Sequence, residues 1–121
     1  MTTVPAPSAV DERGRVSLGN VVVVEDPLVS KLVRAVLQRH GYSVRLADAL
    51  DAASLLQAGD TVLVTNTPAT FLEFATRVPL VYLTSQPDVL VRAAFRNCRV
   101  VVKPFLPEDL VQAVGTLIGP S

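Results

Sequence analysis

Four consecutive valines, Val21 to Val24, constrain the fold of this chain more than any other stretch, and two carboxylates, Glu25 and Asp26, follow them directly. A β-branched run that ends in charged residues predicts a strand buried on both faces, which is typical of a parallel sheet covered by helices. Neighbouring carboxylates are costly unless water, a cation or a lysine compensates them. Because ligands bind at the carboxyl ends of strands in open parallel sheets, the acid pair predicts a site.

Apolar strands and amphipathic helices alternate along the rest of the chain. Strands are predicted at the valine run and over residues 42–47, 61–65, 79–84 and 99–103. Helices are predicted over residues 27–40, 48–58, 71–77, 85–97 and 107–118. Five such units predict an α/β fold, a doubly wound five-stranded parallel sheet with right-handed crossovers.

Helical spacing predicts which side of each helix faces the sheet. In the first helix Ser30 belongs to the polar side, and the expected inward set is Leu28, Val29, Leu32, Val33, Val36 and Leu37. In the second helix the expected inward residues are Leu50, Ala53 and Leu56.

Residues 1–18 are predicted to be a flexible leader, and residues 19–119 to be one domain. Val16 and Leu18, followed by Gly19 and Asn20, also fit a hairpin with the valine run. We reject the hairpin, because a central strand has both edges taken by parallel neighbours.

Composition narrows the partners. Lysine plus arginine equals aspartate plus glutamate, 11 of each, which argues against nucleic acid or an anionic membrane as the main partner. The single cysteine, Cys98, excludes an internal disulfide and fits a reducing compartment. No apolar run approaches the roughly 18 residues needed to cross a bilayer, and the N-terminus lacks a signal-peptide pattern. We therefore expect a cytoplasmic protein.

Polar groups stand at the ends of several predicted strands, so they should converge on one rim of the sheet. Together they offer a cation site, hydroxyls and an ammonium suited to a phosphoryl group. They are Glu25 and Asp26, Thr65 and Asn66, Thr84 and Ser85, and Lys103.

With these residues in view, the chain from about Asn20 to Ile118 resembles the receiver domains of bacterial two-component response regulators. The resemblance rests on Val-Val-Glu-Asp-Pro-Leu-Val at residues 23–29, His40-Gly41-Tyr42, Tyr82-Leu83-Thr84, and Val102-Lys103-Pro104-Phe105. It implies a flavodoxin-like sheet with strand order 2-1-3-4-5. It also implies magnesium at Glu25 and Asp26, a switch hydroxyl at Thr84, a phosphoryl-pairing Lys103, and a cis peptide bond before Pro104.

One departure from the resemblance matters most. Receivers carry a phosphoryl-accepting aspartate at the end of the third strand, where this chain has Thr65 or Asn66, according to how the shortened loop is aligned. Neither a hydroxyl nor an amide forms the acyl phosphate of an aspartate acceptor. The substitution also removes an oxygen ligand, so any magnesium binding should be weak. The resemblance therefore implies a degenerate receiver that is not an enzyme.

Each signal also has a structural explanation. Glu25 and Asp26 could simply cap a helix, Lys103 could be their counter-charge, and Thr84 could be an ordinary strand-end threonine. Neither Cys98 nor His40 has an expected functional role.

Partners are expected through residues 85–97, 99–103 and 107–118, the elements that receivers use to meet other proteins or one another. Val91 and Phe95 would form an apolar patch there if they point outward, or a neighbouring segment could cover them.

Three functional hypotheses follow. The first is a stand-alone pseudo-receiver, with no attached output domain, that signals by binding a protein partner or a second copy. The second is a receiver whose rim still binds magnesium or a phosphorylated ligand. The third is a small flavodoxin-like enzyme. A flavin phosphate would need a Ser/Thr- or Gly-rich loop after the first strand, but the two acids and Pro27 stand there instead, which argues against this hypothesis.

Overall fold

The computed structural model describes residues 17–118 with the exception of 58 and 60. Along this part of the chain the elements are β1 (Asn20–Val24), α1 (Pro27–Arg39), β2 (Ser43–Leu46), α2 (Ala49–Gln57), β3 (Thr61–Thr65), η2 (Pro68–Phe74), β4 (Leu80–Thr84), α3 (Val89–Ala94), β5 (Cys98–Val102) and α4 (Pro107–Ile118). The element η2 is a 3₁₀ helix. All the predicted strands and helices are present, and β3 and α4 have the predicted bounds.

Residues 1–16 of the predicted leader, Ala58 at the predicted end of the second helix, and residue 119 lie outside the described residues. The described helices include none long and apolar enough to span a membrane.

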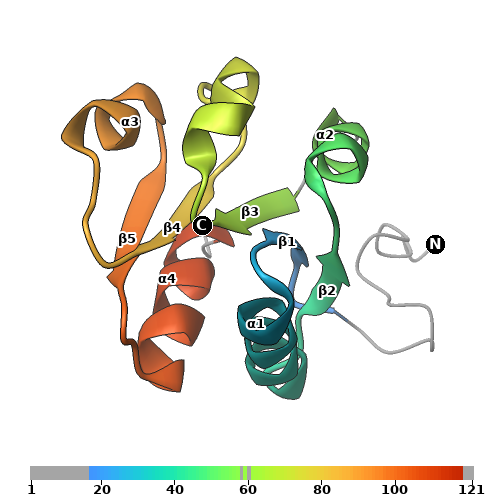
Figure 1. Cartoon of the computed structure of the whole chain (residues 1–121). Helices are drawn as coiled ribbons and strands as arrows, with labels where there is room; N and C mark the ends of the chain where they lie inside the picture. The colour runs from blue at the N-terminus through green and yellow to red at the C-terminus, as the bar shows by residue number, and fades with distance from the viewer. Residues whose placement is uncertain (1–16, 58, 60, 119–121) are drawn as a thin grey trace, which may run out of the picture.

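The five strands form one sheet in the order β2-β1-β3-β4-β5, and every adjacent pair is parallel (Figure 1). This confirms the predicted flavodoxin-like fold. The valine strand β1 lies between β2 and β3, so neither of its edges is free for a hairpin partner. Val24 pairs with Thr65, so the chain leaves β1 and β3 at the same edge of the sheet.

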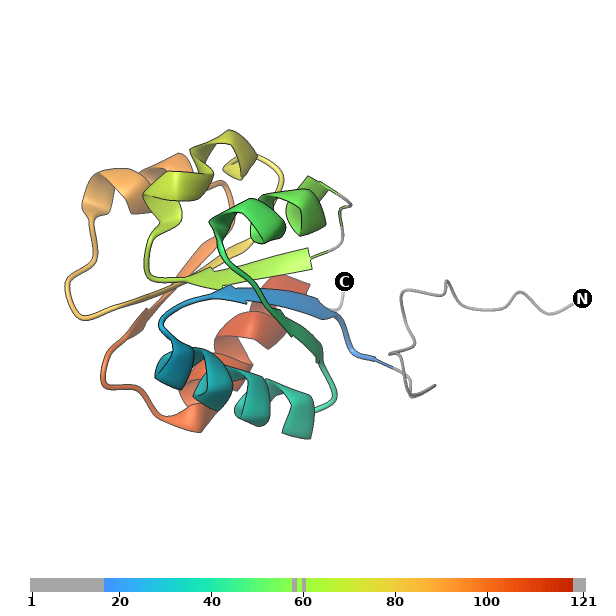
Figure 2. The ribbon, with the colours of Figure 1, turned by 45° about the vertical axis from the view of Figure 1, so that its right-hand side comes forward.

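Helices cover both faces of the sheet, α1 and α4 on one face and α2, η2 and α3 on the other (Figure 2). The valines of β1 alternate between the two layers: Val21 and Val23 pack beneath α1 and α4, and Val22 packs beneath α2 and η2. Each large apolar side chain buried in this way contributes about 1.5–3 kcal/mol. The valine run therefore contributes to both layers of the core, as β3 and β4 do.

The inward face of α1 differs from the predicted one. Leu28 is 80% exposed and Leu32 is 51% exposed, whereas Val33, Leu37 and the polar Ser30 are buried. Leu32 precedes the buried Val33 by one position, a rotation of about 100° around the helix, and Leu28 precedes the buried Ser30 by two, a rotation of about 200°. The apolar spacing was too broad to show which edge of the stripe faces solvent.

The prediction of the inward face of α2 was also partly wrong. Leu50 is 83% exposed, while Ala52 and Leu56 are buried and Ala53 is half-buried. Ala52 and Leu56 are four residues apart and share one side of the helix, from which Leu50 is rotated by about 200°.

The predicted helix over residues 85–97 is much shorter in the structure. Only Val89–Ala94 is helical, and Phe95 has an extended backbone with φ −87° and ψ 126°. The backbone N–H of Arg96 donates to the carbonyl of Ala75, at 2.9 Å, which ties this turn to the segment after η2. As a result Phe95 lies in the core, 4% exposed, and Val91 packs partly buried against the same cluster. The prediction of an outward patch made of Val91 and Phe95 was therefore wrong.

Candidate functional site at the carboxyl ends of the strands

Asp26 begins α1. It has an extended backbone, and its Oδ1 accepts hydrogen bonds from the backbone N–H groups of Leu28, at 3.0 Å, and Val29, at 3.1 Å. Pro27 occupies the first position of the helix, where no N–H is required. A carboxylate at this position satisfies two otherwise unpaired donors and interacts favourably with the helix dipole. The structural explanation considered for Asp26 therefore holds.

Glu25 forms an ion pair with Lys103, across the sheet edge from β5. The Lys103 Nζ lies 2.9 Å from the Glu25 Oε2, too close for an ion to lie between them. The Glu25 side chain has no exposed surface, and that of Lys103 is 26% exposed. Glu25 Oε1 accepts the backbone N–H of Asp26 at 3.2 Å. The lysine thus compensates the buried carboxylate, as the counter-charge explanation predicted.

Ser30 completes this corner, although it was not among the predicted site residues. Its side chain is buried, and its Oγ donates to the backbone carbonyl of Glu25 at 3.0 Å. A serine one turn into a helix that follows a strand-end acid is the signal that could have indicated this bond. The bond fixes the backbone of Glu25 beneath the first turn of α1.

Thr65 and Asn66 differ sharply in exposure at the end of β3. Thr65 is 0% exposed, and its Oγ1 accepts the backbone N–H of Thr67 at 3.0 Å and lies 3.2 Å from the Thr67 Oγ1. Asn66 is exposed. The Thr65 hydroxyl is therefore engaged in the turn after the strand, and Asn66 is the residue that meets solvent at the rim.

Thr84, at the end of β4, is hydrogen-bonded within the turn that follows the strand. Its Oγ1 accepts the backbone N–H of Gln86 at 3.1 Å, and its carbonyl accepts the N–H of Lys103 at 2.9 Å. The Lys103–Pro104 peptide bond is cis, as predicted. These bonds hold the ends of β4 and β5 together beside the rim.

The donor set at the rim does not fit a magnesium ion. Magnesium requires near-octahedral oxygen coordination, usually from carboxylates and waters. Here the buried carboxylate of Glu25 contacts an ammonium, and the Oδ1 of Asp26 already accepts two N–H groups. Within residues 17–118 apart from 58 and 60, no three His, Cys, Asp or Glu side chains are grouped closely enough to hold a metal.

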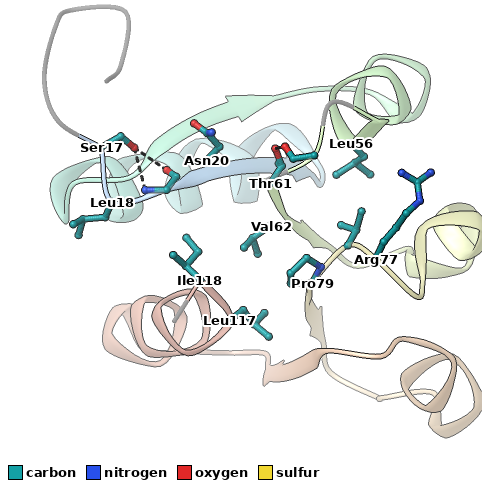
Figure 3. Close-up of a pocket in the computed structure, with 13 residues that line it drawn as sticks. Ser17, Leu18, Asn20, Leu56, Thr61, Val62, Arg77, Pro79, Leu117 and Ile118 are labelled. Atoms are coloured by element: carbon teal, nitrogen blue, oxygen red, sulfur yellow. Dashed lines mark hydrogen bonds between the residues drawn. The ribbon is translucent and has the colours of Figure 1, made fainter. Parts of the chain in front are cut away.

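A hollow of about 490 Å³ lies at the opposite edge of the sheet, where β1, β3 and β4 begin (Figure 3). None of the rim residues lines it. Its wall is mixed: Leu56, Val62, Pro79, Leu117 and Ile118 are apolar, whereas Ser17, Asn20, Thr61 and Arg77 are polar. The sequence did not indicate this hollow, because its lining comes from five separate segments of the chain.

Solved structures share this architecture. A response regulator receiver domain protein from Bacillus halodurans superposes with a TM-score of 0.69 at 19% identity, over 85% of this chain and 98% of that one. A response regulator receiver protein from Burkholderia phymatum gives a TM-score of 0.65 at 22% identity, over 85% and 97%. The chemotaxis protein CheY4 of Vibrio cholerae gives 0.61 at 20% identity, over 82% and 98%.

The sequence matches no protein-family model and no curated protein. The structural likeness therefore shows the fold: five parallel strands in the order 2-1-3-4-5 with helices between them, as in CheY-like receiver domains.

Proposed function

We propose that this chain is a pseudo-receiver, a signalling protein that acts by binding a protein partner and is not phosphorylated at the end of β3. The observation that carries the proposal is the state of that strand end. Thr65 is buried with its hydroxyl bonded to Thr67, and the exposed residue beside it is the amide Asn66. Neither group forms an acyl phosphate, so no catalytic step is proposed.

The ion pair supports the same proposal. In a receiver that binds magnesium, acid oxygens must be available to the metal and the lysine to a phosphoryl group. In this chain Lys103 Nζ and Glu25 Oε2 occupy each other at 2.9 Å. Displacing the lysine would uncover a carboxylate whose side chain is fully buried, and such a charge costs several kcal/mol when left unpaired. We propose that magnesium binding at this rim is weak.

The proposed partner surface is the face made by α3, β5 and α4. β5 is an edge strand that pairs only with β4, so its other edge faces away from the sheet (Figure 1). Four large apolar side chains on or beside these elements are strongly exposed: Val89 at 75%, Leu90 at 82%, Val102 at 54% and Leu106 at 59%. Exposed apolar side chains on one surface are candidates for a protein interface. They replace Val91 and Phe95 as the interface residues.

We further propose that the partner is a protein, either another signalling protein or a second copy of this chain, and that the setting is the cytoplasm. The equal numbers of acidic and basic residues favour neither nucleic acid nor a lipid surface.

Incubation with magnesium and a small phosphodonor tests the central proposal. We expect intact-mass spectra of the native chain to show no phosphoryl adduct. Asn66→Asp is the matched variant, because it adds one carboxylate at the exposed rim position; we expect it to bind magnesium more tightly than the native chain in calorimetric titration. A phosphoryl adduct on the native protein would refute the pseudo-receiver proposal.

The partner surface has a matched test as well. Leu90→Asp should weaken association with a second copy in sedimentation velocity experiments. Leu28→Asp, at a side chain of nearly equal exposure on α1, should leave association unchanged. Weakening by Leu28→Asp instead would move the interface to α1, and a native chain that stays monomeric would leave another protein as the partner.

A further inference from the structure

The helix α3 is apolar on all sides, yet the described part of the domain does not cover it. Five of its six residues are apolar, and the sixth is Arg92. None of the six is buried, and Val89 and Leu90 are 75% and 82% exposed. A helix of this composition is normally buried in a globular protein. The pattern therefore indicates a docking surface.

Exposed arginines follow this apolar surface along the chain. Arg92 lies in α3, Arg96 in the turn after it and Arg99 near the start of β5, and all three residues are exposed. Burial raises the pKa of the Cys98 thiol, and the charges of Arg92 and Arg99 both oppose that rise, so both lie near it. The one ion pair within residues 17–118 apart from 58 and 60 is at the carboxyl rim. Among these residues no carboxylate pairs with the three guanidinium groups, which can therefore bind carboxylates of another molecule.

The start of α2 has the opposite charge. Leu50 is 83% exposed, and the exposed residues Asp48 and Asp51 flank it in the sequence. The Asp48 Oδ1 accepts the N–H of Asp51 at 2.8 Å, which fixes this turn at the beginning of the helix. Arg45, on the neighbouring strand β2, forms no ion pair with either acid. An exposed leucine therefore stands beside carboxylates on α2, whereas the one on α3 stands beside arginines.

The two surfaces belong to one helix layer but lie at its two ends. Figure 1 shows α2 and α3 on opposite sides of η2, and all three helices cover the same face of the sheet. The sequence has the same division: residues 46–76 carry four acids and no base, and residues 77–107 carry five bases and one acid. Because η2 lies between them, the two surfaces of one chain cannot meet. Two copies can bring them together.

We propose that α3 of one copy docks on the start of α2 of a second copy, with Leu90 against Leu50 and with Arg92 and Arg96 facing Asp48 and Asp51. The inference rests on the proposed function, for which it names the partner and the partner's surface. The net charge of zero means that two copies do not repel each other at long range. Such a head-to-tail contact leaves one free surface on each chain of a dimer, so further copies can add.

A two-fold contact on the α3 face is the alternative within the same chain chemistry. Pairing two α3 helices brings Arg92 close to its own copy, and like charges across an interface oppose binding. The acids at the start of α4 could instead meet the arginines, but the leucine beside them, Leu106, is 59% exposed, whereas Leu50 is 83% exposed. The start of α2 therefore offers more apolar surface to cover.

Blocking each surface separately tests the proposal. Leu90→Asp blocks α3 and Leu50→Asp blocks α2, and both side chains are so exposed that the fold does not depend on them. In sedimentation velocity, we expect the native chain to form species larger than a dimer as its concentration rises. Each variant should associate about tenfold more weakly or less. Leu28→Asp, at an equally exposed leucine of α1, should associate like the native chain.

Mixing the two blocked variants distinguishes a head-to-tail contact from a two-fold one. The mixture retains one intact contact, between α3 of Leu50→Asp and α2 of Leu90→Asp, so we expect dimers and nothing larger. A two-fold contact predicts that Leu50→Asp associates like the native chain and that mixing restores nothing. That result would overturn the inference and leave the proposed partner surface in place. A native chain that stays monomeric would also overturn it, with another protein as the partner.

Charge exchange then tests which groups face each other. Arg92→Glu and Asp51→Arg should each weaken association, and the double variant Arg92→Glu/Asp51→Arg should restore it, because both charges change sides. Glu108→Arg is the matched control, since it changes the net charge as Asp51→Arg does but lies at the start of α4. If Glu108→Arg weakened association as much as Asp51→Arg, or if the double variant stayed weak, the proposed pairing would be wrong.

Discussion

The two ends of the sheet contrast in how their side chains are used. At the carboxyl end, the polar groups of β1, β3, β4 and β5 bond to one another or to nearby backbone, as in the Glu25–Lys103 pair and the Thr65–Thr67 turn. At the amino end, the strands begin around a hollow whose wall combines apolar and polar side chains. The end at which ligands usually bind in this architecture is therefore closed by its own residues, and the open surface lies at the opposite edge.

The difference teaches that a polar strand end is not by itself a binding site. Buried polar groups need partners, and the chain can supply them itself. Once a lysine neutralises a buried carboxylate and caps satisfy the N–H groups, few ligating atoms remain. Apolar surface carries no such requirement, because leaving it exposed costs only the hydrophobic transfer energy.

The largest loss of stability is expected for Lys103→Met, at the carboxyl end of the sheet. This variant leaves the Glu25 carboxylate without its counter-charge. The Glu25 side chain has no exposed surface, so water cannot replace the lysine. Breaking a fully buried ion pair costs about 3–5 kcal/mol; because Lys103 is partly exposed, we expect about 2–3 kcal/mol. The measurement is the free energy of unfolding in urea.

The control for this experiment is the double variant Glu25→Gln/Lys103→Met, which removes both charges and should recover most of the loss. If Lys103→Met were as stable as the native chain, the Glu25 carboxylate would have to be solvated. The carboxyl end of the sheet would then not be closed by its own residues.

A smaller effect is expected for Asp26→Ala, which removes the cap of α1. Loss of an aspartate cap costs about 1 kcal/mol, measurable in the same urea titration. Asp88→Ala is the matched variant, because Asp88 Oδ1 accepts N–H groups from Leu90, at 2.9 Å, and Val91, at 3.3 Å, with the same geometry. Since α3 has six residues and none of them is buried, Asp88→Ala should cost less. If Asp26→Ala and Asp88→Ala lowered the free energy of unfolding equally, packing of α1 against the core would not strengthen the effect of its cap.

The smallest effect concerns Cys98, at the beginning of β5 near the amino end. Burial raises the pKa of its thiol above the ordinary value, and the nearby charges of Arg92 and Arg99 oppose this only in part. The native thiol therefore keeps its proton to a higher pH than the unfolded one. Its contribution to stability is complete below the unfolded thiol pKa and is lost as the pH rises through the native pKa.

We accordingly expect the native chain to lose stability slightly faster than Cys98→Ala as the pH rises above the ordinary thiol range. The comparison is made by urea unfolding at each pH. Burial also raises the pKa of Tyr42, but both chains share that tyrosine, so it cancels in the difference. Parallel pH profiles for the two chains would contradict the shift at Cys98.

The interior of the sheet could be predicted because its signals are local. The valine run, the strand Thr61–Thr65 and the helix Pro107–Ile118 follow from apolar runs and from prolines and glycines at their ends. The acid pair and Lys103 were expected at one rim, because parallel strands bring their carboxyl ends to one edge.

The faces of single helices could not be predicted as well. Leu28 and Leu50 were predicted to be core residues and are exposed, while Ser30 was predicted to lie on the surface and is buried. Phe95 is buried in an extended turn after α3, next to the hydrogen bond between Arg96 and Ala75. Each outcome depends on a contact with a segment distant in the sequence.

The sequence by itself determined the class of fold and the residues that gather at the carboxyl rim, because periodicity is a property of short stretches and parallel strands bring their carboxyl ends to one edge. Only the tertiary structure decided that Lys103 reaches Glu25, that the Thr65 hydroxyl closes its own turn, and that a hollow remains at the amino end. Those features are set by distances of a few ångströms between elements, and no local pattern in the sequence specifies such distances.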